Sequence, residues 1–149
     1  MALRSTDLMI GDWVKFPIGY EKIQEISYQQ EIGGYCVWFA ASATLFPCMI
    51  EDIEPIPLIP EILEKNGFER CVSSIAKTST AVIPICDSNQ FCHKNLGNLR
   101  IIDKHPCHGW TLRTDVFGDT SHNEIHHINY VHELQHALKL CGITLNIEL

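Results

Sequence analysis

The most specific chemical pattern in this chain is the pentapeptide HELQH at positions 132–136, which matches the HExxH pattern of zinc-binding hydrolases. On a helix, His132 and His136 stand four residues apart and project from one face, so both imidazoles could bind the same zinc ion. Glu133 would then polarise a metal-bound water as the general base. These three residues are the candidate metal ligands and the candidate catalytic residue of a zinc-dependent hydrolase.

A catalytic zinc site needs a third protein ligand, and the residues after the pentapeptide do not supply one. The extended zincin pattern requires Gly and His where this chain has Lys139 and Gly142. Glu148 is the sole acidic residue after His136, and it lies in the terminal tail. An upstream ligand stays open as an alternative. The residues that could supply it are Cys92, Cys107, His122, His126 and His127.

The helix that would carry the motif is predicted over about residues 129–141, with Asn129 as its N-cap and Gly142 as its stop. The two histidines fall on its polar face, for which solvent is the more common environment. We therefore interpret His132 as a partly buried helix residue whose ring bonds a neighbouring group, with metal binding as the alternative. The apolar stripe of the helix consists of Val131, Leu134, Ala137, Leu138 and Cys141.

Seven cysteines are present, and their odd number together with the lack of an export signal disfavours a disulfide framework. We expect most of them to be small buried apolar residues. A second group of possible zinc ligands lacks the two-to-four-residue spacing of structural zinc sites, so it is not interpreted as one. This group consists of Cys86, Cys92, His93, His105, Cys107 and His108.

Composition limits the classes of function. The 149 residues are 46% hydrophobic, which is ordinary for a folded chain. The formal net charge is -7 with 11 Lys and Arg, so nucleic-acid binding, which depends on phosphate attraction, is disfavoured. Neither a signal peptide nor a membrane-spanning segment is recognisable, and the sequence predicts a cytoplasmic protein.

Short apolar runs with turn residues between them predict several strands in the first third of the chain. They lie at 9–16, 22–26, 35–40 and 44–50, and together they predict a small curled sheet or SH3-like barrel over residues 1–52. Residues 53–60 contain three prolines and are predicted to form an extended connector, because proline excludes both helix interiors and central strands.

The remainder, residues 61–149, is predicted to be a second α+β region. A short helix is predicted over residues 61–68, with Pro60 at its first turn and Gly67 as its C-terminal stop. A small antiparallel sheet follows, with a loop at 117–123 and, after the late helix, an apolar tail at 143–149 that is compatible with a strand. The predicted strands of this sheet are 71–75, 80–86, 99–103, 110–116 and 124–128. The expected fold class is α+β with two helices.

Three stretches, 7–14, 52–68 and 130–135, resemble a group of short uncharacterised proteins encoded by gut anaerobic bacteria and by their phages and mobile elements. The shared pattern is an opening Leu-x-Ile-Gly-(Asn or Asp), an Ile-Pro-Leu connector, a helix ending in Gly-Phe and a late Tyr-Val-His-x-Leu-Gln helix. Glu133 and His136 fall at positions where this group commonly has other residues, including Gln and Asn. The resemblance therefore implies a structural role for the helix.

Taken together, the sequence favours a nonenzymatic binding or accessory protein of a phage or mobile element, with no cofactor and with another protein as its partner. The alternative is a zinc-dependent hydrolase in which His132 and His136 bind the metal and Glu133 is the general base. A third possibility is a nucleic-acid-binding module, which the negative charge makes the weakest of the three.

Overall fold

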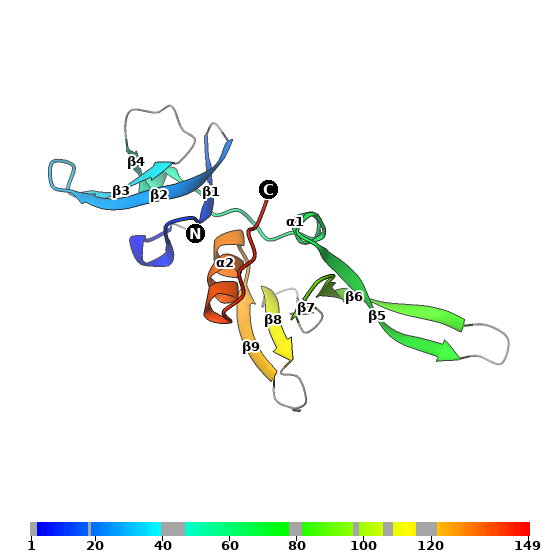
Figure 1. Cartoon of the computed structure of the whole chain (residues 1–149). Coiled ribbons are helices and arrows are strands. Elements are labelled where there is room, and N and C mark those ends of the chain that lie inside the picture. The colour runs from blue at the N-terminus through cyan, green and yellow to red at the C-terminus, as the bar shows by residue number, and fades with distance from the viewer. Residues whose placement is uncertain are drawn as a thin grey trace. The chain divides into compact units, whose positions relative to one another are not determined.

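The computed structural model describes residues 3–17, 19–39, 47–77, 82–96, 99–105, 109–115 and 122–149. It shows an α+β fold with a curled four-stranded antiparallel sheet, a five-stranded antiparallel sheet and two α-helices, which confirms the predicted fold class (Figure 1). Backbone contacts group the chain into two compact units. Unit 1 consists of Met1–Pro57 with Tyr130–His136, and unit 2 consists of Leu58–Asn129 with Ala137–Leu149.

The sheet of unit 1 has the order β1-β2-β3-β4, with each strand antiparallel to the next. Its strands are β1 (Trp13–Phe16), β2 (Gly19–Gln29), β3 (Gly34–Phe39) and β4 (Cys48–Met49). The first residues of β2 pair with β1 and the later residues pair with β3, and a register shift between Ile23 and Glu25 separates the two pairings. Such a bulge bends a strand, and the curl of this sheet follows from it.

Alternating apolar residues give the sheet of unit 1 one buried face, as the sequence predicts for these strands. The buried core includes Leu8, Val14, Ile23, Val37, Phe39, Cys48, Ile50 and Ile53. The predicted fourth strand is confirmed at Cys48–Met49, directly after Pro47, while residues 44–46 lie outside the described part of the chain. Two short 3₁₀ helices, η1 (Ser5–Asp7) and η2 (Ile50–Asp52), were not predicted.

The proline-rich segment is extended, as predicted, and its backbone is paired at two points. Glu54 forms an antiparallel bridge with Lys15, and Pro57 forms one with Tyr130. Ile53 and Ile56 turn into the interior and are 4% and 3% exposed. The connector is therefore an ordered part of unit 1 up to Pro57.

Unit 2 begins with helix α1 (Pro60–Lys65), which has Pro60 in its first turn and stops at Gly67 with φ of 84°, as predicted. The five-stranded sheet follows as a simple antiparallel meander in chain order. Its strands are β5 (Phe68–Lys77), β6 (Val82–His93), β7 (Leu99–His105), β8 (Gly109–Asp115) and β9 (His122–Ile128).

Strand boundaries in unit 2 differ from the prediction where polar residues interrupt the apolar runs. β6 continues to His93 rather than ending near residue 86, and the buried Phe91 pairs with Arg70 on β5 and with Ile101 on β7. The tail at 143–149 is irregular and not a strand. The side chain of Asn66 binds this tail: it donates to the Glu148 carbonyl at 2.7 Å and accepts from the Glu148 amide at 2.8 Å.

Two of the cysteines form a disulfide, which corrects the expectation of unpaired thiols. Cys71 on β5 and Cys92 on β6 are bonded, with their Cα atoms 5.6 Å apart, because the two strands are paired at this point. Cys36 and Cys48 are free and buried, as expected for small apolar residues. The side chains of Cys86 and Cys107 lie outside the described residues.

Helix α2 (Val131–Leu140) is the late helix that the sequence predicts, and Gly142 stops it with φ of 70°. The predicted apolar stripe is confirmed, since Val131, Leu134, Ala137 and Leu138 are all at most 2% exposed. Within the described residues, no helix combines the length and the apolar composition that a membrane crossing requires.

Candidate binding pocket around the HELQH segment

The HELQH segment occupies the first turns of α2, and Glu133 caps the start of this helix. The Tyr130 amide donates to Glu133 Oε2 at 3.1 Å, which is one half of a capping box. Asn129 was predicted as the N-cap, and this is wrong by one residue, because the helix begins at Val131 and the Asn129 side chain donates to the His127 carbonyl. The Val131 amide donates to the Ile56 carbonyl at 2.9 Å, so the helix start is tied to the connector.

Gln135 joins the helix to the beginning of β1 through both ends of its amide. Its Oε1 accepts from the Trp13 amide at 3.0 Å, and its Nε2 donates to the Gly11 carbonyl at 3.1 Å. The side chain thereby satisfies the backbone groups on either side of Asp12. Gln135, the fourth residue of the HELQH pentapeptide, thus provides backbone hydrogen bonds of the kind that a neighbouring strand provides.

His136 contacts Asp12 between these two hydrogen bonds. Its Nε2 lies 2.7 Å from Asp12 Oδ2, and Asp12 is fully buried at 0% exposure. The same carboxylate oxygen accepts from the Met9 amide at 2.7 Å, which closes the tight turn before β1. Asp12 Oδ1 is buried and has no hydrogen-bond partner. The contact with this buried carboxylate therefore fixes the orientation of the His136 ring.

His132 is more deeply buried than predicted, although the exposed Lys139 lies on the same polar face of α2. Its residue exposure is 3%, and its ring stacks on Tyr130 with an interplanar angle of 10° and a centroid distance of 5.8 Å. Its Nδ1 is buried without a hydrogen-bond partner. Burial lowers the pKa of His132 and outweighs the nearby carboxylates of Asp12 and Glu133, which raise it, so the ring is neutral at pH 7.

The zinc alternative requires a third donor beside the two histidines. Among the residues that the structure describes, no three His, Cys, Asp or Glu side chains are grouped so that they could hold a metal ion. Of the nominated upstream ligands, Cys92 is in the disulfide, and His126 contacts Thr111 at 3.1 Å and Glu124 at 3.4 Å. The side chains of Cys107 and His122 lie outside the described residues.

The second group of possible zinc ligands, between Cys86 and His108, is not brought together among the described residues either. His93 is 7% exposed, packs edge-on against Phe68, and accepts from the Asn95 amide at 3.3 Å through Nδ1. Cys92 is oxidised with Cys71. The side chains of Cys86, His105, Cys107 and His108 are outside the described residues.

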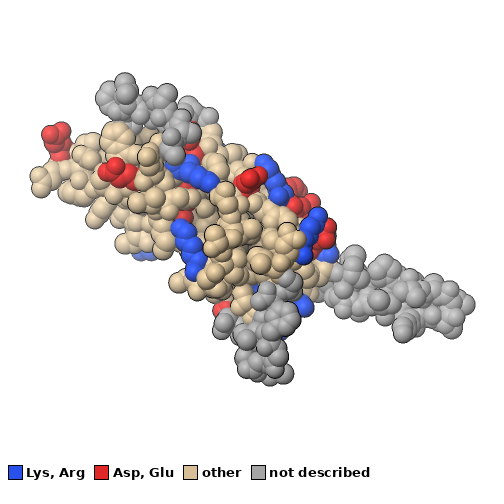
Figure 2. Space-filling view, in the orientation of Figure 1, with Lys and Arg blue, Asp and Glu red and all other residues tan. Residues whose placement is uncertain are grey.

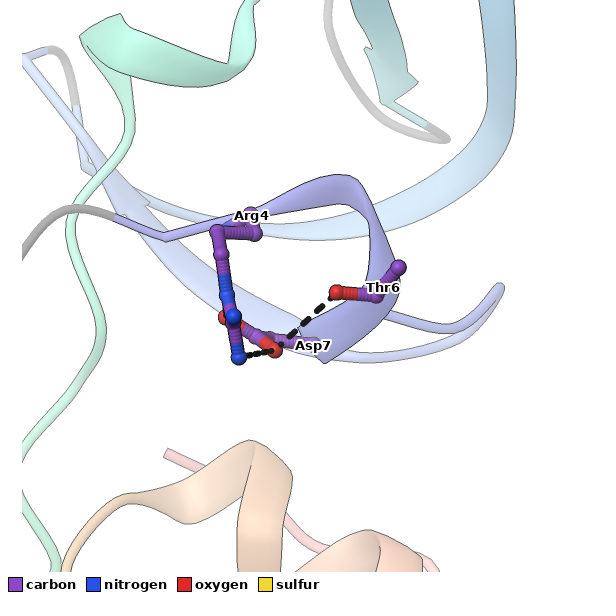
Figure 3. Close-up of polar contacts among 3 residues, drawn as sticks. All are labelled: Arg4, Thr6 and Asp7. Atoms are coloured by element: carbon purple, nitrogen blue, oxygen red, sulfur yellow. Dashed lines mark hydrogen bonds and ion pairs between the residues drawn. The ribbon is translucent and has the colours of Figure 1, made fainter.

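A pocket of about 290 Å³ opens beside the first turns of α2, and all of its walls belong to unit 1. Arg4 and Asp7 of η1 form one wall, where Arg4 Nη2 lies 3.0 Å from Asp7 Oδ1 and Thr6 also donates to this oxygen (Figure 3). The Arg4 bond lowers the pKa of Asp7, so that carboxylate is ionised. The lining residues are Leu3, Arg4, Asp7, Pro55, Tyr130, His132, Glu133 and His136.

Sequence reasoning found His132, Glu133 and His136 but missed Asp12, Tyr130 and the Arg4–Asp7 pair. Asp12 was interpreted as a turn residue, and its burial follows from a contact 124 positions away in the chain. One signal pointed to this region: the segments 7–14 and 130–135 were both used for the expected resemblance, and they meet through the hydrogen bonds of Gln135 to Gly11 and Trp13. No protein-family model, no curated protein and no solved structure matches this chain.

Proposed function

We propose that the protein is a nonenzymatic, cytoplasmic binding module, an accessory protein of a phage or mobile element whose partner is another protein. The observation that carries this proposal is the exposed aromatic hairpin formed by β2 and β3 in unit 1. Tyr28 and Tyr35 lie directly opposite each other in the strand register. They are 54% and 47% exposed, and Ile32 in the turn between the strands is 55% exposed.

The two tyrosines are held in place before any partner arrives. Their ring centroids are 5.3 Å apart at an interplanar angle of 71°, an edge-to-face pair across the two strands. Ring pairs of this kind lose little conformational entropy on binding, and tyrosine is enriched at the centres of protein interfaces. An exposed apolar cluster on a hairpin is typical of an interaction surface.

Charge supports a protein partner with a basic surface. Unit 1 contains three Lys and Arg residues but nine Asp and Glu residues, whereas unit 2 contains eight and nine. Most of the net negative charge of the chain therefore belongs to the unit that carries the hairpin. Acidic side chains lie on an otherwise uncharged surface at the end of the view where this hairpin lies (Figure 2). Phosphate groups would be repelled by such a unit, which disfavours nucleic acid.

The contacts of the HELQH segment support a binding protein over a zinc-dependent hydrolase. Glu133 caps its own helix, Gln135 bonds the backbone of β1, and His136 contacts a buried carboxylate. A zinc peptidase needs the glutamate free to act on a metal-bound water. The resemblance to proteins of phages and mobile elements includes His132 and Gln135 but neither Glu133 nor His136, which agrees with a structural role.

Partner capture from the host cell, followed by binding measurements with purified partner, tests this proposal. The double variant Tyr28→Ser, Tyr35→Ser removes the aromatic pair, and Leu140→Ser is the matched control, because Leu140 is an 80% exposed apolar residue of unit 2. We expect the dissociation constant to rise at least about tenfold in the double variant and to stay unchanged in the control. Equal affinity of all three proteins at equal thermal stability would refute the hairpin as the binding surface.

A further inference from the structure

The aromatic pair of the β2–β3 hairpin continues the core side of the unit 1 sheet beyond its core. Residues two apart on a strand share a face, so Tyr28 and Tyr35 lie on the same face as Ile26 and Val37, which are also paired. Val37 is fully buried in the core, whereas the two tyrosines are 54% and 47% exposed. The apolar side of the hairpin is therefore open at this end.

The neighbouring strands pair with other parts of the hairpin. β1 pairs with residues 19–22 of β2, and β4 pairs with Cys36 and Val37 of β3 (Figure 1). Cys36 points to the face opposite the tyrosines, where it is buried and its Sγ lies 3.6 Å from Met49 Sδ. The tyrosine side is therefore the side on which a partner can contact this end of the hairpin.

The hairpin carries negative charge beside its aromatic pair. Residues 23–39 contain Glu25 and Glu31 and neither Lys nor Arg. Glu31 is exposed and lies in the turn between the two tyrosines. The three cations of unit 1 each contact another group, in the pairs Arg4–Asp7, Lys15–Glu54 and Lys22–Trp13. The charge of this hairpin therefore attracts a cationic group.

Charge complementarity disfavours a second copy of the chain as the occupant. Symmetric docking of two hairpins would place their acidic ends together, and like charges across an interface reduce affinity. A partner protein that carries Lys or Arg at its contact surface meets no such repulsion. The surface therefore favours a cationic segment of another protein.

The geometry of the aromatic pair favours arginine over lysine. The two rings meet at 71°, so the ring that presents its edge keeps both of its faces free of the other ring. A cation within about 6 Å of a ring centroid is attracted to the ring face. Guanidinium is planar and more weakly hydrated than ammonium, so it stacks on such a face with a smaller loss of hydration.

We propose, on the basis of the proposed function, that the partner protein presents an arginine side chain to the Tyr28–Tyr35 pair. The guanidinium stacks on an exposed tyrosine face, and the negative charge of Glu31 attracts it. The aliphatic part of the arginine side chain covers carbon atoms of the rings. The hairpin thus recognises an arginine-bearing segment of a protein.

Titration of the full chain with the peptide acetyl-Gly-Arg-Gly-amide, followed by NMR, tests this site. We expect saturable shifts of the Tyr28 and Tyr35 resonances with a dissociation constant on the order of 10 mM. The citrulline peptide has almost the same shape but no charge, and it should bind at least about threefold more weakly. Equal binding of the citrulline or the lysine peptide, or no saturation by the arginine peptide, would overturn the proposal.

Two variants with matched controls assign the binding to the hairpin. The double variant Tyr28→Ser, Tyr35→Ser should lose at least about threefold in affinity for the arginine peptide, and Tyr20→Ser, which removes a 55% exposed tyrosine at the start of β2, should lose nothing. Glu31→Gln should weaken binding about twofold, and Glu51→Gln, at an exposed residue outside the hairpin, should not. Equal effects of a variant and its control, at equal thermal stability, would overturn the proposal.

The captured partner separates this inference from the proposed function. If the double variant loses the partner but replacing the arginines of the partner's contact surface by glutamine leaves the affinity unchanged, the arginine inference fails alone. A partner that binds the double variant with unchanged affinity refutes the proposed function, and the arginine peptide then decides this site by itself. Sedimentation of the chain alone should show no dimer that depends on the two tyrosines. Such a dimer would make a second copy the occupant and contradict the proposal.

Discussion

Asp12 Oδ2 and His136 Nε2 lie 2.7 Å apart, although the two residues are separated by 124 positions in the sequence. The contact joins the turn before β1 to the second turn of α2. It is enclosed by the two hydrogen bonds of Gln135 to Gly11 and Trp13. The polar residues of the HELQH segment therefore act as a joint within unit 1, and this explains the segment without a metal ion.

Replacement of Gln135 tests the joint. Gln135→Ala leaves the Trp13 amide and the Gly11 carbonyl without their side-chain partner, and we expect the free energy of unfolding to fall by about 1–3 kcal/mol. Gln135→Glu keeps the acceptor but loses the donor, so an intermediate loss is expected. Denaturant unfolding measures both. The exposed Gln30→Ala serves as the control, and a loss in the control equal to that of Gln135→Ala would contradict the account.

Stability should depend on pH through His132. Burial lowers the pKa of His132 below its ordinary value of 6.5, so the unfolded chain binds a proton at this residue more readily than the folded chain. The contribution of His132 to stability is therefore complete above pH 6.5 and is lost as the pH falls toward the folded-state pKa. The slope from this one group cannot exceed about 1.4 kcal/mol per pH unit.

The matched variants for this effect are His132→Gln and His127→Gln, since His127 is exposed. Unfolding free energies between pH 5 and pH 7 should change less with pH in His132→Gln than in the wild-type protein. His127→Gln should retain the wild-type dependence. A wild-type slope in His132→Gln would show that the neutral, buried ring is not the source.

The Cys71–Cys92 disulfide should stabilise unit 2 without being needed for its fold. The residues are 21 positions apart, and closing a loop of this size contributes about 3 kcal/mol in the chain-entropy model. Backbone pairing of Glu69 with Cys92 brings the strands together in either redox state. A cytoplasmic location would keep both thiols reduced, so the reduced chain must fold.

Unfolding of the Cys71→Ser variant, with and without reductant, measures this contribution. We expect a lower midpoint than in the oxidised wild-type protein and no further effect of reductant. Cys141→Ser, which removes a free thiol, should keep the response of the wild-type protein to reductant. Loss of the folded state in Cys71→Ser would contradict a cytoplasmic location.

The sequence was sufficient to predict local structure and insufficient to predict the joint. Alternating apolar residues and glycine stops, such as Gly67 and Gly142, are local signals, and the elements they predict are confirmed. Strand β6 was predicted too short because polar residues precede Phe91. The partner of an amide such as Gln135 depends on which backbone groups the fold leaves unpaired, and no local pattern contains that information.

The start of α2 illustrates the same limit. Asn129 is a favourable N-cap by residue type, yet the helix begins at Val131, because Glu133 bonds the Tyr130 amide. The prediction of a solvated polar face is wrong at Gln135 and His136, which contact Trp13 and Asp12, and it holds at the exposed Lys139. A helical wheel separates polar from apolar faces but does not show which polar face is buried.

The zinc content of protein purified without an affinity tag is the most direct test of the central claim that HELQH is a structural joint. It should be measured for the wild-type protein, Glu133→Gln and His136→Asn, together with their thermal unfolding. We predict no stoichiometric zinc in any of them, and a lower unfolding temperature in His136→Asn, because the replacement disturbs the contact with Asp12. One zinc ion per wild-type chain that is lost in His136→Asn, with a hydrolytic activity that disappears in Glu133→Gln, would contradict the account.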